Sequence, residues 1–355
     1  MSPQTILRSA ACLSGSALEE VRPAEIVVES GIIREVRRRT EKSPTDIDLG
    51  SLTLIPGFID AHVHIGLFPP KDVLAGGVTT ARDLGWPPID IYPLVTRSED
   101  PLWPGPRILA AGPMLTCADG YPTRAAWAPP GTGRIVGGVE EARAAVAERA
   151  AEGAAVVKIA LNAAAGPVLD ASTLAAICEA AHESHLQVTG HIYGLEELHK
   201  ALDAGIDELA HMLMSPERIP DETLSRMVEN GVRCVPTLSV QETRVKPFAI
   251  DNLQRFIAAG GSCIYGTDLG NEGPLPGIDA PEIADMTAAG MDGGSIVASA
   301  TVNSARELGL TDVGVLEAGM QADIVGVNGN PLQDARALAD VRFVMRAGVV
   351  HRKPS

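Results

Sequence analysis

The feature that most constrains this chain is a regular alternation of short apolar runs with alanine-rich runs between about residues 55 and 310. One example is VEEARAAVAERAAEG (139–153), which is followed directly by AAVVKIAL (154–161). The first run has the length and composition of a helix, and the second those of a buried strand. Strands that alternate with helices of about 10–15 residues predict βα units around a parallel sheet.

Eight segments of this region have the pattern of core strands. They are residues 57–63, 77–83, 107–113, 154–160, 186–192, 206–212, 232–238 and 262–268. Eight parallel strands, each followed by a helix, predict an α/β fold of the (β/α)8 TIM-like barrel type. A chain of 355 residues is long enough for such a barrel and a small additional domain.

Both ends of the chain have a different, β-rich pattern. Residues 25–39 predict two short strands joined by a tight turn at Ser30–Gly31, and residues 322–327 and 341–352 predict further strands. We expect the two ends to meet in one small β-sandwich side domain.

The predicted division therefore has two parts. Residues 1–55 and 312–355 form the composite β-sandwich domain, and residues 56–311 form the barrel. Within the barrel region, the Pro/Gly-rich stretch 119–138 predicts a long surface loop.

The charge of the chain limits its partners. It has 29 Lys and Arg against 45 Asp and Glu, a formal net charge of −16. Such a field repels phosphate backbones and anionic lipid, so we expect a small-molecule substrate and neither nucleic acid nor membrane as a partner. No run of about 20 apolar residues predicts a membrane span. The oligomeric state stays open, a homo-oligomer included.

The expected compartment is the cytoplasm. The first twenty residues lack the apolar run of a secretion signal, and their one basic residue, Arg8, lies in the middle. The five cysteines are widely spaced, without a C-x-x-C pair, which is typical of buried thiols in a reducing compartment.

Metal-binding residue types cluster at the ends of the predicted core strands. These residues are His62 and His64 in the first strand, His191 in the fifth, His211 in the sixth and Asp268 in the eighth. The carboxyl ends of barrel strands converge on the face that carries the active site. A lone histidine on an apolar strand is usually a hydrogen-bonded core residue. Here four of the eight histidines of the chain fall at predicted strand ends, so coincidence is a poor explanation of their positions.

Two local features strengthen the metal hypothesis. Residues i and i+2 of a strand point to the same side, so His62 and His64 are placed to chelate one ion together. Lys158 lies inside the apolar run VVKIA. Burial of an unpaired ammonium is costly and favours loss of its proton. The neutral amine then adds carbon dioxide to give a carbamate, whose two oxygens are able to bridge two cations.

At these residues the chain resembles the amidohydrolase superfamily. The similarity lies in LIPGFIDAHVH, GVTTARDLG, Lys158, His191, His211, YGTDLG and LEAGMQADIVGVNGNPL. The imidazolonepropionase-like and prolidase-like metal-dependent hydrolases are the most similar branch, through VKIA, GHIYG, AGIDELAH, VPTLS and GTDLG. The resemblance covers nearly the whole chain, and it includes the side domain made from both termini.

The resemblance implies a binuclear metal centre. His62, His64 and Asp268 would hold the more buried ion, and His191 and His211 the more exposed one. Lys158, as its carbamate, would bridge the two ions. Zinc is the default metal for imidazole and carboxylate ligands, although manganese, cobalt and iron stay open.

The same resemblance implies the reaction. A hydroxide shared by the two ions would attack an amide or cyclic amide carbonyl of a small molecule, an N-acyl amino acid or a dipeptide. Asp268 would take the proton of this hydroxide and pass it to the leaving nitrogen.

Other residues are weaker candidates for the site. Tyr193, two residues after His191, is a candidate substrate contact. Arg82 and Asp83 are predicted to form a salt bridge beside the site, and Asn271 and Glu272 to lie in a loop over it.

Several alternatives remain at this point. The same centre would serve a lactonase or a phosphotriester hydrolase, and a heterocycle deaminase is a weaker alternative because such enzymes usually hold one ion without a bridging lysine. A non-enzymatic scaffold relative would be expected to lose ligands, and here all six are present. No G-x-S-x-G motif supports a serine hydrolase.

Overall fold

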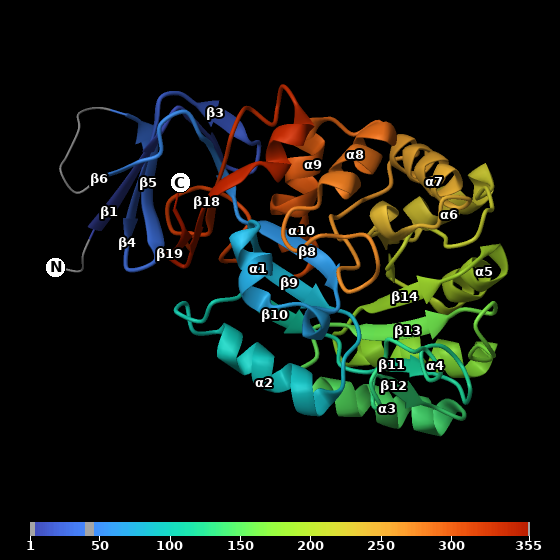
Figure 1. Cartoon of the computed structure of the whole chain (residues 1–355). Helices are drawn as coiled ribbons and strands as arrows, with labels where there is room; N and C mark the ends of the chain where they lie inside the picture. The colour runs from blue at the N-terminus through green and yellow to red at the C-terminus, as the bar shows by residue number, and fades with distance from the viewer. Residues whose placement is uncertain (1–3, 40–45, 354–355) are drawn as a thin grey trace.

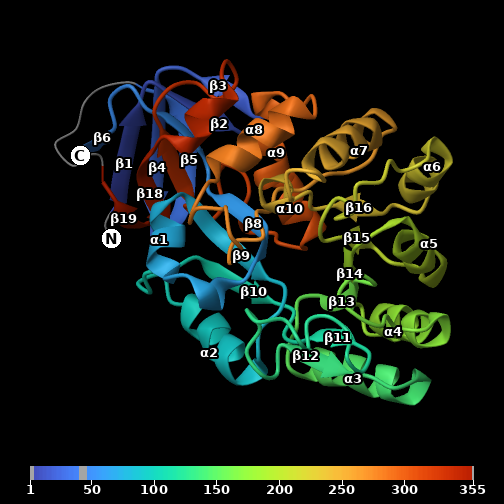
Figure 2. The ribbon, with the colours of Figure 1, turned by 45° about the vertical axis from the view of Figure 1, so that its right-hand side comes forward.

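The structure is a computed structural model, and it describes residues 4–39 and 46–353. Two parallel sheets form its centre, with helices along their outer side (Figure 1; Figure 2). The smaller sheet has the strand order β10–β9–β8, and the larger has β12–β11–β13–β14–β15–β16. Their bounds are β8 (Phe58–Val63), β9 (Val78–Asp83), β10 (Arg107–Ala110), β11 (Met114–Thr116), β12 (Gly133–Ile135), β13 (Val157–Leu161), β14 (Val188–Ile192), β15 (Glu208–Leu209) and β16 (Arg233–Cys234).

Helices connect the parallel strands, as the sequence pattern predicts. In Figure 2, α3 to α7 lie outside the curved row of β13 to β16. The helices are α1 (Pro70–Ala75), α2 (Pro88–Ser98), α3 (Val139–Ala151), α4 (Ala171–Glu183), α5 (Leu195–Ala204), α6 (Asp221–Glu229), α7 (Lys246–Ala258), α8 (Ala280–Ala288), α9 (Gly293–Ala300) and α10 (Val302–Glu307), with 3-10 turns at Ile65–Leu67, Leu238–Val240 and Ala335–Ala339. Aspartate caps begin α4, α8 and α9, where each side chain accepts a backbone N–H of the first turn.

Backbone hydrogen bonds join the two parallel sheets at both edges. On one side, Ala155 N donates to Ala110 O over 2.8 Å, between the start of β13 and the end of β10. On the other side, the segment 262–268 lies between β16 and β8. There Ile264 N donates to Cys234 O over 3.0 Å, and Ala61 N donates to Tyr265 O over 2.9 Å. The strand ends are therefore held around one common centre.

The eighth predicted core strand differs from the expectation. Residues 262–268 form no regular strand, and only an isolated parallel bridge joins Cys263 to Cys234. Two features of the backbone explain this. Asp268 has φ 56°, a left-handed conformation in which a strand does not continue. A Cβ on Gly266 would lie 2.3 Å from the Val235 side chain, so the segment approaches its neighbour too closely for a regular ladder.

Strands from both ends of the chain pair in one sheet. This sheet has the order β19–β18–β17–β7–β2–β3, and a second sheet has the order β5–β4–β1–β6. Figure 1 shows both sheets on the side of the molecule that holds the two chain ends. The strands are β1 (Gln4–Ser9), β2 (Ala11–Ser14), β3 (Glu19–Val21), β4 (Ala24–Glu29), β5 (Ile32–Arg38), β6 (Asp46–Asp48), β7 (Thr53–Pro56), β17 (Ile324–Val327), β18 (Val341–Arg346) and β19 (Val349–Arg352).

These terminal sheets have a hydrophobic cluster of their own. It includes Leu7, Ile26, Leu54, Ile324 and Phe343, all fully buried. The domain boundaries at residues 55/56 and 311/312 stay a prediction, and residues 1–3, 40–45 and 354–355 of the predicted side domain lie outside the described residues.

The predicted hairpin at residues 25–39 is confirmed. β4 and β5 pair in antiparallel fashion, and the turn residues Ser30 and Gly31 have φ 53° and 80°. Two positive φ angles are typical of a two-residue hairpin turn of type I′. Among the described residues, no helix has both the length and the apolar character needed to cross a membrane.

The predicted salt bridge between Arg82 and Asp83 is wrong. The two side chains alternate across β9, so they point to opposite sides of the strand. Arg82 Nη2 instead donates to Glu208 Oε1 over 2.5 Å, and Arg233 Nε donates to Glu208 Oε2 over 2.6 Å. Burial opposes the charge of Glu208, but the two guanidinium groups outweigh it and lower the pKa of this carboxyl to about 2.

Candidate metal centre

Five of the six predicted ligands lie at or just after the carboxyl ends of strand positions, and the sixth, Lys158, lies inside β13. His62 belongs to β8, Lys158 to β13 and His191 to β14, while His64, His211 and Asp268 lie in the segments that follow strand positions. Each of the six residues is buried, with a residue exposure of 0–5%. Six polar residues buried together at strand ends need partners, because an unpaired buried polar group is costly.

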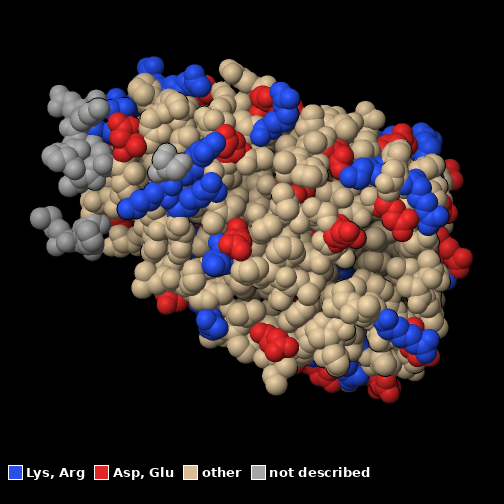
Figure 3. Space-filling view, in the orientation of Figure 1, with Lys and Arg blue, Asp and Glu red and all other residues tan. Residues whose placement is uncertain are grey.

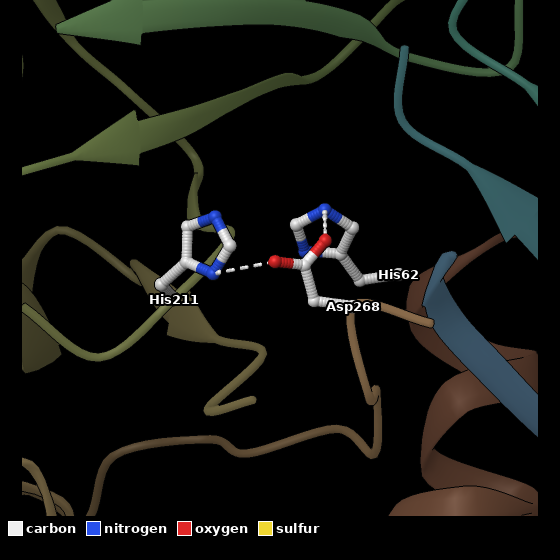
Figure 4. Close-up of side chains that lie close together, drawn as sticks. All are labelled: His62, His211 and Asp268. Carbon is white, nitrogen blue, oxygen red and sulfur yellow. Dashed lines mark ion pairs between the residues drawn. The ribbon is translucent and has the colours of Figure 1, made fainter. Parts of the chain in front are cut away.

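Asp268 lies between three of the histidines. Its Oδ1 is 3.1 Å from His62 Nε2 and 3.3 Å from His64 Nε2. Its Oδ2 is 3.9 Å from Nδ1 of His211 (Figure 4). The four side chains come from three separate segments of the sequence, which contain His62 and His64, His211, and Asp268, and they meet at one point.

Backbone carbonyls fix the orientation of two of these rings. His62 Nδ1 lies 2.8 Å from Ala210 O, and His64 Nδ1 lies 3.2 Å from Gly85 O. A carbonyl only accepts, so in both rings Nδ1 carries the hydrogen, and Nε2 keeps its lone pair toward Asp268. Metal-binding histidines usually show this arrangement, with the second ring nitrogen donating to a backbone carbonyl or carboxylate.

A second pair of nitrogens faces each other beside this group. Nδ1 of His191 is 3.1 Å from Nε2 of His211. The other nitrogen of His211 lies 2.8 Å from the Thr237 hydroxyl, and the other nitrogen of His191 lies 3.1 Å from the Asn162 amide. Thr237 has φ 43°, an unusual conformation for a β-branched residue, and such conformations cluster at functional sites.

The spacing of these donors fits bound metal. Two ligand atoms held about 2.0–2.1 Å from one tetrahedral zinc ion lie about 3.3 Å apart. The observed separations of 3.1 Å and 3.3 Å to Asp268, and of 3.1 Å between His191 and His211, match this value. Within the described residues, His62 Nε2, Asp268 Oδ1 and Lys158 Nζ are buried without a hydrogen-bond partner. The ligand set therefore fits a metal centre by spacing and by its unsatisfied atoms.

The protonation states of the site also favour metal binding. Burial, followed by the charge of Lys158, lowers the pKa of His191 to about 3 and that of His62 well below its usual range. Neutral imidazole is the form that binds metal. Burial lowers the pKa of Lys158 to about 7, although Asp268 opposes this shift. A substantial fraction of its amine is therefore neutral near neutral pH.

Sequence reasoning missed two aromatic residues at this site. The Tyr121 ring stacks on His191 at 4.7 Å between centroids, and the Trp127 ring lies 4.6 Å from that of His64. Trp127 Nε1 donates to the Tyr121 hydroxyl over 3.1 Å. Both belong to the stretch predicted only as a surface loop. The available signal was two of the chain's seven Trp and Tyr residues in one Pro/Gly-rich segment.

The three weaker candidates, Tyr193, Asn271 and Glu272, have few contacts with the predicted ligands. Tyr193 is half-buried directly after β14, and its hydroxyl makes no hydrogen bond to a described residue. Asn271 donates its amide to the carbonyl of Asp268 over 3.2 Å, and Glu272 is exposed. Asn162, which contacts His191, is a further residue that the sequence did not single out.

Comparison with known proteins identifies the family of this site. The sequence model of the "Amidohydrolase family" matches residues 53–352, which is most of the chain. The chain belongs to the amidohydrolase family. The expected superfamily is thereby confirmed, and amidohydrolase relatives of known structure imply a TIM-barrel fold with α/β content.

Individual relatives of this amidohydrolase come from bacteria and fungi. An uncharacterized protein of Mycobacterium tuberculosis is 30% identical over 199 residues, which is 52% of this chain and 50% of that protein. The ochratoxinase of Aspergillus niger is 24% identical over 383 residues, covering 85% of this chain and 76% of that enzyme. The chain thus matches about half the length of its mycobacterial relative.

A solved structure extends the likeness over the whole amidohydrolase. The putative prolidase from Bifidobacterium longum has a TM-score of 0.83 and is 26% identical. The match covers 100% of this chain and 96% of that one. This likeness supports the prolidase-like branch that the motifs indicate.

Proposed function

We propose that this amidohydrolase is a metal-dependent enzyme that hydrolyses a C–N bond, in an amide or a cyclic amide of a small molecule. Family membership and the names ochratoxinase and putative prolidase among its relatives support hydrolysis of this kind of bond. The observation that carries the proposal is a buried cluster of six metal-binding residue types. Four histidines and Asp268 lie at or after strand ends, and Lys158 lies inside β13.

The donor geometry suggests how the residues divide between two ions. His62, His64 and Asp268 share one group of close contacts and would hold the first ion. His191 and His211 face each other and would hold the second. Lys158, without a partner for its amine, would bridge both as a carbamate. Zinc is the metal that this imidazole and carboxylate set favours.

When bound, such ions lower the pKa of water and polarise a carbonyl oxygen. In the proposed reaction, water gives its oxygen to the carbonyl carbon, the C–N bond breaks, and the leaving nitrogen takes a proton. Asp268 is placed to accept a proton from the attacking water at a carboxylate oxygen and to pass it to that nitrogen. Asp268 Oδ1 faces Nε2 of His62 and Nε2 of His64, so this carboxylate points into the centre.

We expect close to two transition-metal ions per chain after exhaustive dialysis of the purified enzyme. The reason is the presence of two separate groups of facing donors, with an unpartnered buried lysine in the same site. Elemental analysis by plasma mass spectrometry measures the content. One ion or none in an active preparation would contradict the binuclear centre and would favour the deaminase alternative.

Tyr193→Phe is expected mainly to raise KM, by about tenfold if one hydrogen bond to the substrate of ~1.4 kcal/mol is lost. The hydroxyl bonds no described residue, so its loss leaves no partner in the protein unsatisfied. Steady-state kinetics of the two proteins measure the split between kcat and KM. A loss of kcat with unchanged KM would show that the tyrosine acts in the transition state instead.

A further inference from the structure

Two aromatic side chains of one loop form what we define as the aromatic wall, Tyr121 and Trp127. Tyr121 covers His191 of one donor group, and Trp127 covers His64 of the other. A hydrogen bond of 3.1 Å from Trp127 Nε1 to the Tyr121 hydroxyl holds the two rings together. Only 3% of the residues in the chain are aromatic, so this pair is a concentration of flat apolar surface at the metal centre.

The loop that carries the wall is closed mainly on itself. Its turns are made by Gly120 N to Cys117 O, Thr123 N to Gly120 O and Thr132 N to Pro129 O, at 2.9–3.1 Å. Loops on a rigid barrel often determine which substrate is bound, because they change without disturbing the strands. The wall is therefore placed to contact the part of a substrate next to the reacting bond.

Cations that could bind a substrate carboxylate are scarce around this wall. The loops after the parallel strand positions contain three arginines, Arg124, Arg218 and Arg244. Their side chains are 60–70% exposed, and each is paired with a carboxylate, of Asp119, Asp251 and Glu242 in turn. Figure 3 shows the same tendency on one face, where many Lys and Arg side chains lie beside acidic ones over α6 and α7.

The remaining cationic residue of the site, Lys158, is not free to bind a substrate carboxylate. Lys158 is 1% exposed and lies among the metal ligands. A carboxylate is normally recognised by a free arginine fork or a lysine, and burying it without one is costly. The net charge of −16 further disfavours an anion.

We propose that the substrate is an uncharged amide with an aromatic ring next to the scissile bond, and that the wall of Tyr121 and Trp127 binds this ring. This inference rests on the proposed function and selects among its substrates, against free dipeptides and N-acyl amino acids. An aromatic ring packed on the wall gains the offset or edge contacts that such pairs favour. Hydrolysis gives a carboxylic acid and an arylamine, with one water consumed.

Acetanilide and 4-acetamidobenzoate form a matched test, because the same C–N bond carries a ring without or with a carboxylate. With the metal-reconstituted enzyme, we expect kcat/KM to be about tenfold or more higher for acetanilide, since the carboxylate would lack a cation. The para carboxylate makes the arylamine the slightly better leaving group, so intrinsic reactivity opposes this result. Equal or higher kcat/KM for 4-acetamidobenzoate would overturn the inference while leaving C–N hydrolysis established.

Binding gives a second measurement that does not depend on turnover. Acetophenone and 4-acetylbenzoate are uncleavable counterparts of the two substrates, and calorimetric titration gives their Kd. Trp127→Leu should weaken acetophenone binding about two- to twelvefold, the range of one aromatic contact. Trp103→Leu is the matched control, because Trp103 precedes β10 at the opposite end of the strands, and it should leave Kd unchanged.

These measurements separate the two proposals. Acetophenone binding that depends on Trp127, without hydrolysis of either anilide, would support the wall but overturn the assignment of an anilide as the substrate, and it would not contradict hydrolysis of other C–N bonds. Acetophenone binding that is equal in both variants would overturn the wall, whatever the activity.

Discussion

Lys158→Ala is expected to reduce activity by more than about 100-fold and to lower the metal content toward one ion per chain. Removal of a residue that only orients a metal ligand typically costs about 10–100-fold, so loss of a bridging ligand should cost more. Lys158 Nζ is buried in the strand β13 and has no hydrogen-bond partner among the described residues, so its place in the site is not explained by a structural contact.

Several variants separate the bridging role of Lys158 from a role in packing. Lys158→Arg should not restore activity, because guanidinium stays protonated and repels the ions. Formate or propionate in solution should partly restore Lys158→Ala, since either supplies a bridging carboxylate. Lys200→Ala, which loses only an exposed pair with Glu196, is the control and should stay active. Full activity of Lys158→Ala or Lys158→Arg would show that the lysine is structural.

The carbamate itself has a direct signature. Wild-type enzyme incubated with 13C-labelled bicarbonate and metal should show a carbamate carbon resonance that is absent from Lys158→Ala. Burial lowers the pKa of Lys158 to about 7, so this modification is feasible at neutral pH, because the neutral amine is the form that adds carbon dioxide. Metal-loaded, active enzyme without the resonance would contradict the proposed bridge.

Asp268→Asn is expected to lower kcat by about 10²–10⁴-fold, the usual contribution of a general acid–base group. Asparagine keeps the size of the side chain and one oxygen ligand, but it loses the basic carboxylate. Asp268 has φ 56°, and asparagine tolerates this left-handed conformation as well as aspartate does. The change therefore tests proton transfer and not the fold of the segment.

Metal analysis and kinetics together decide the role of Asp268. We expect metal content largely retained, with a fall in kcat that exceeds any rise in KM. Asp251→Asn changes a half-exposed carboxylate at the surface and is the matched control, with kcat unchanged. A normal kcat in Asp268→Asn would show that another residue moves the proton, and the assigned mechanism would be wrong.

Local patterns in the sequence were sufficient for much of the fold. Apolar runs between alanine-rich helices predicted the strands at the positions of β8, β9, β13 and β14, and the hairpin of β4 and β5. Periodicity is read within one segment, so it works where the segment is regular. It failed at residues 262–268, because the left-handed Asp268 and the close approach of Gly266 depend on contacts with the neighbouring β8 and β16 segments.

The candidate ligands were also readable from the sequence, since their residue types are rare and stand at strand ends. What the sequence could not supply was the partner of each side chain. Arg82 pairs with Glu208, 126 residues away, and not with its neighbour Asp83, because alternate residues of a strand face opposite sides. Asn162 and Tyr121 reach His191 only through the path of their loops, which no periodic pattern encodes.

The sequence by itself thus determined the order of most strands and helices, the β-rich segments at both ends of the chain and the identities of six candidate ligands. The tertiary structure decided which ring nitrogens face one another, which carbonyls hold them, and that Trp127 and Tyr121 cover the centre. The physical reason is the separation along the chain of the residues that interact. Strand and helix patterns follow from neighbours along the chain, whereas donor geometry within an ångström follows from packing between segments that are remote in sequence.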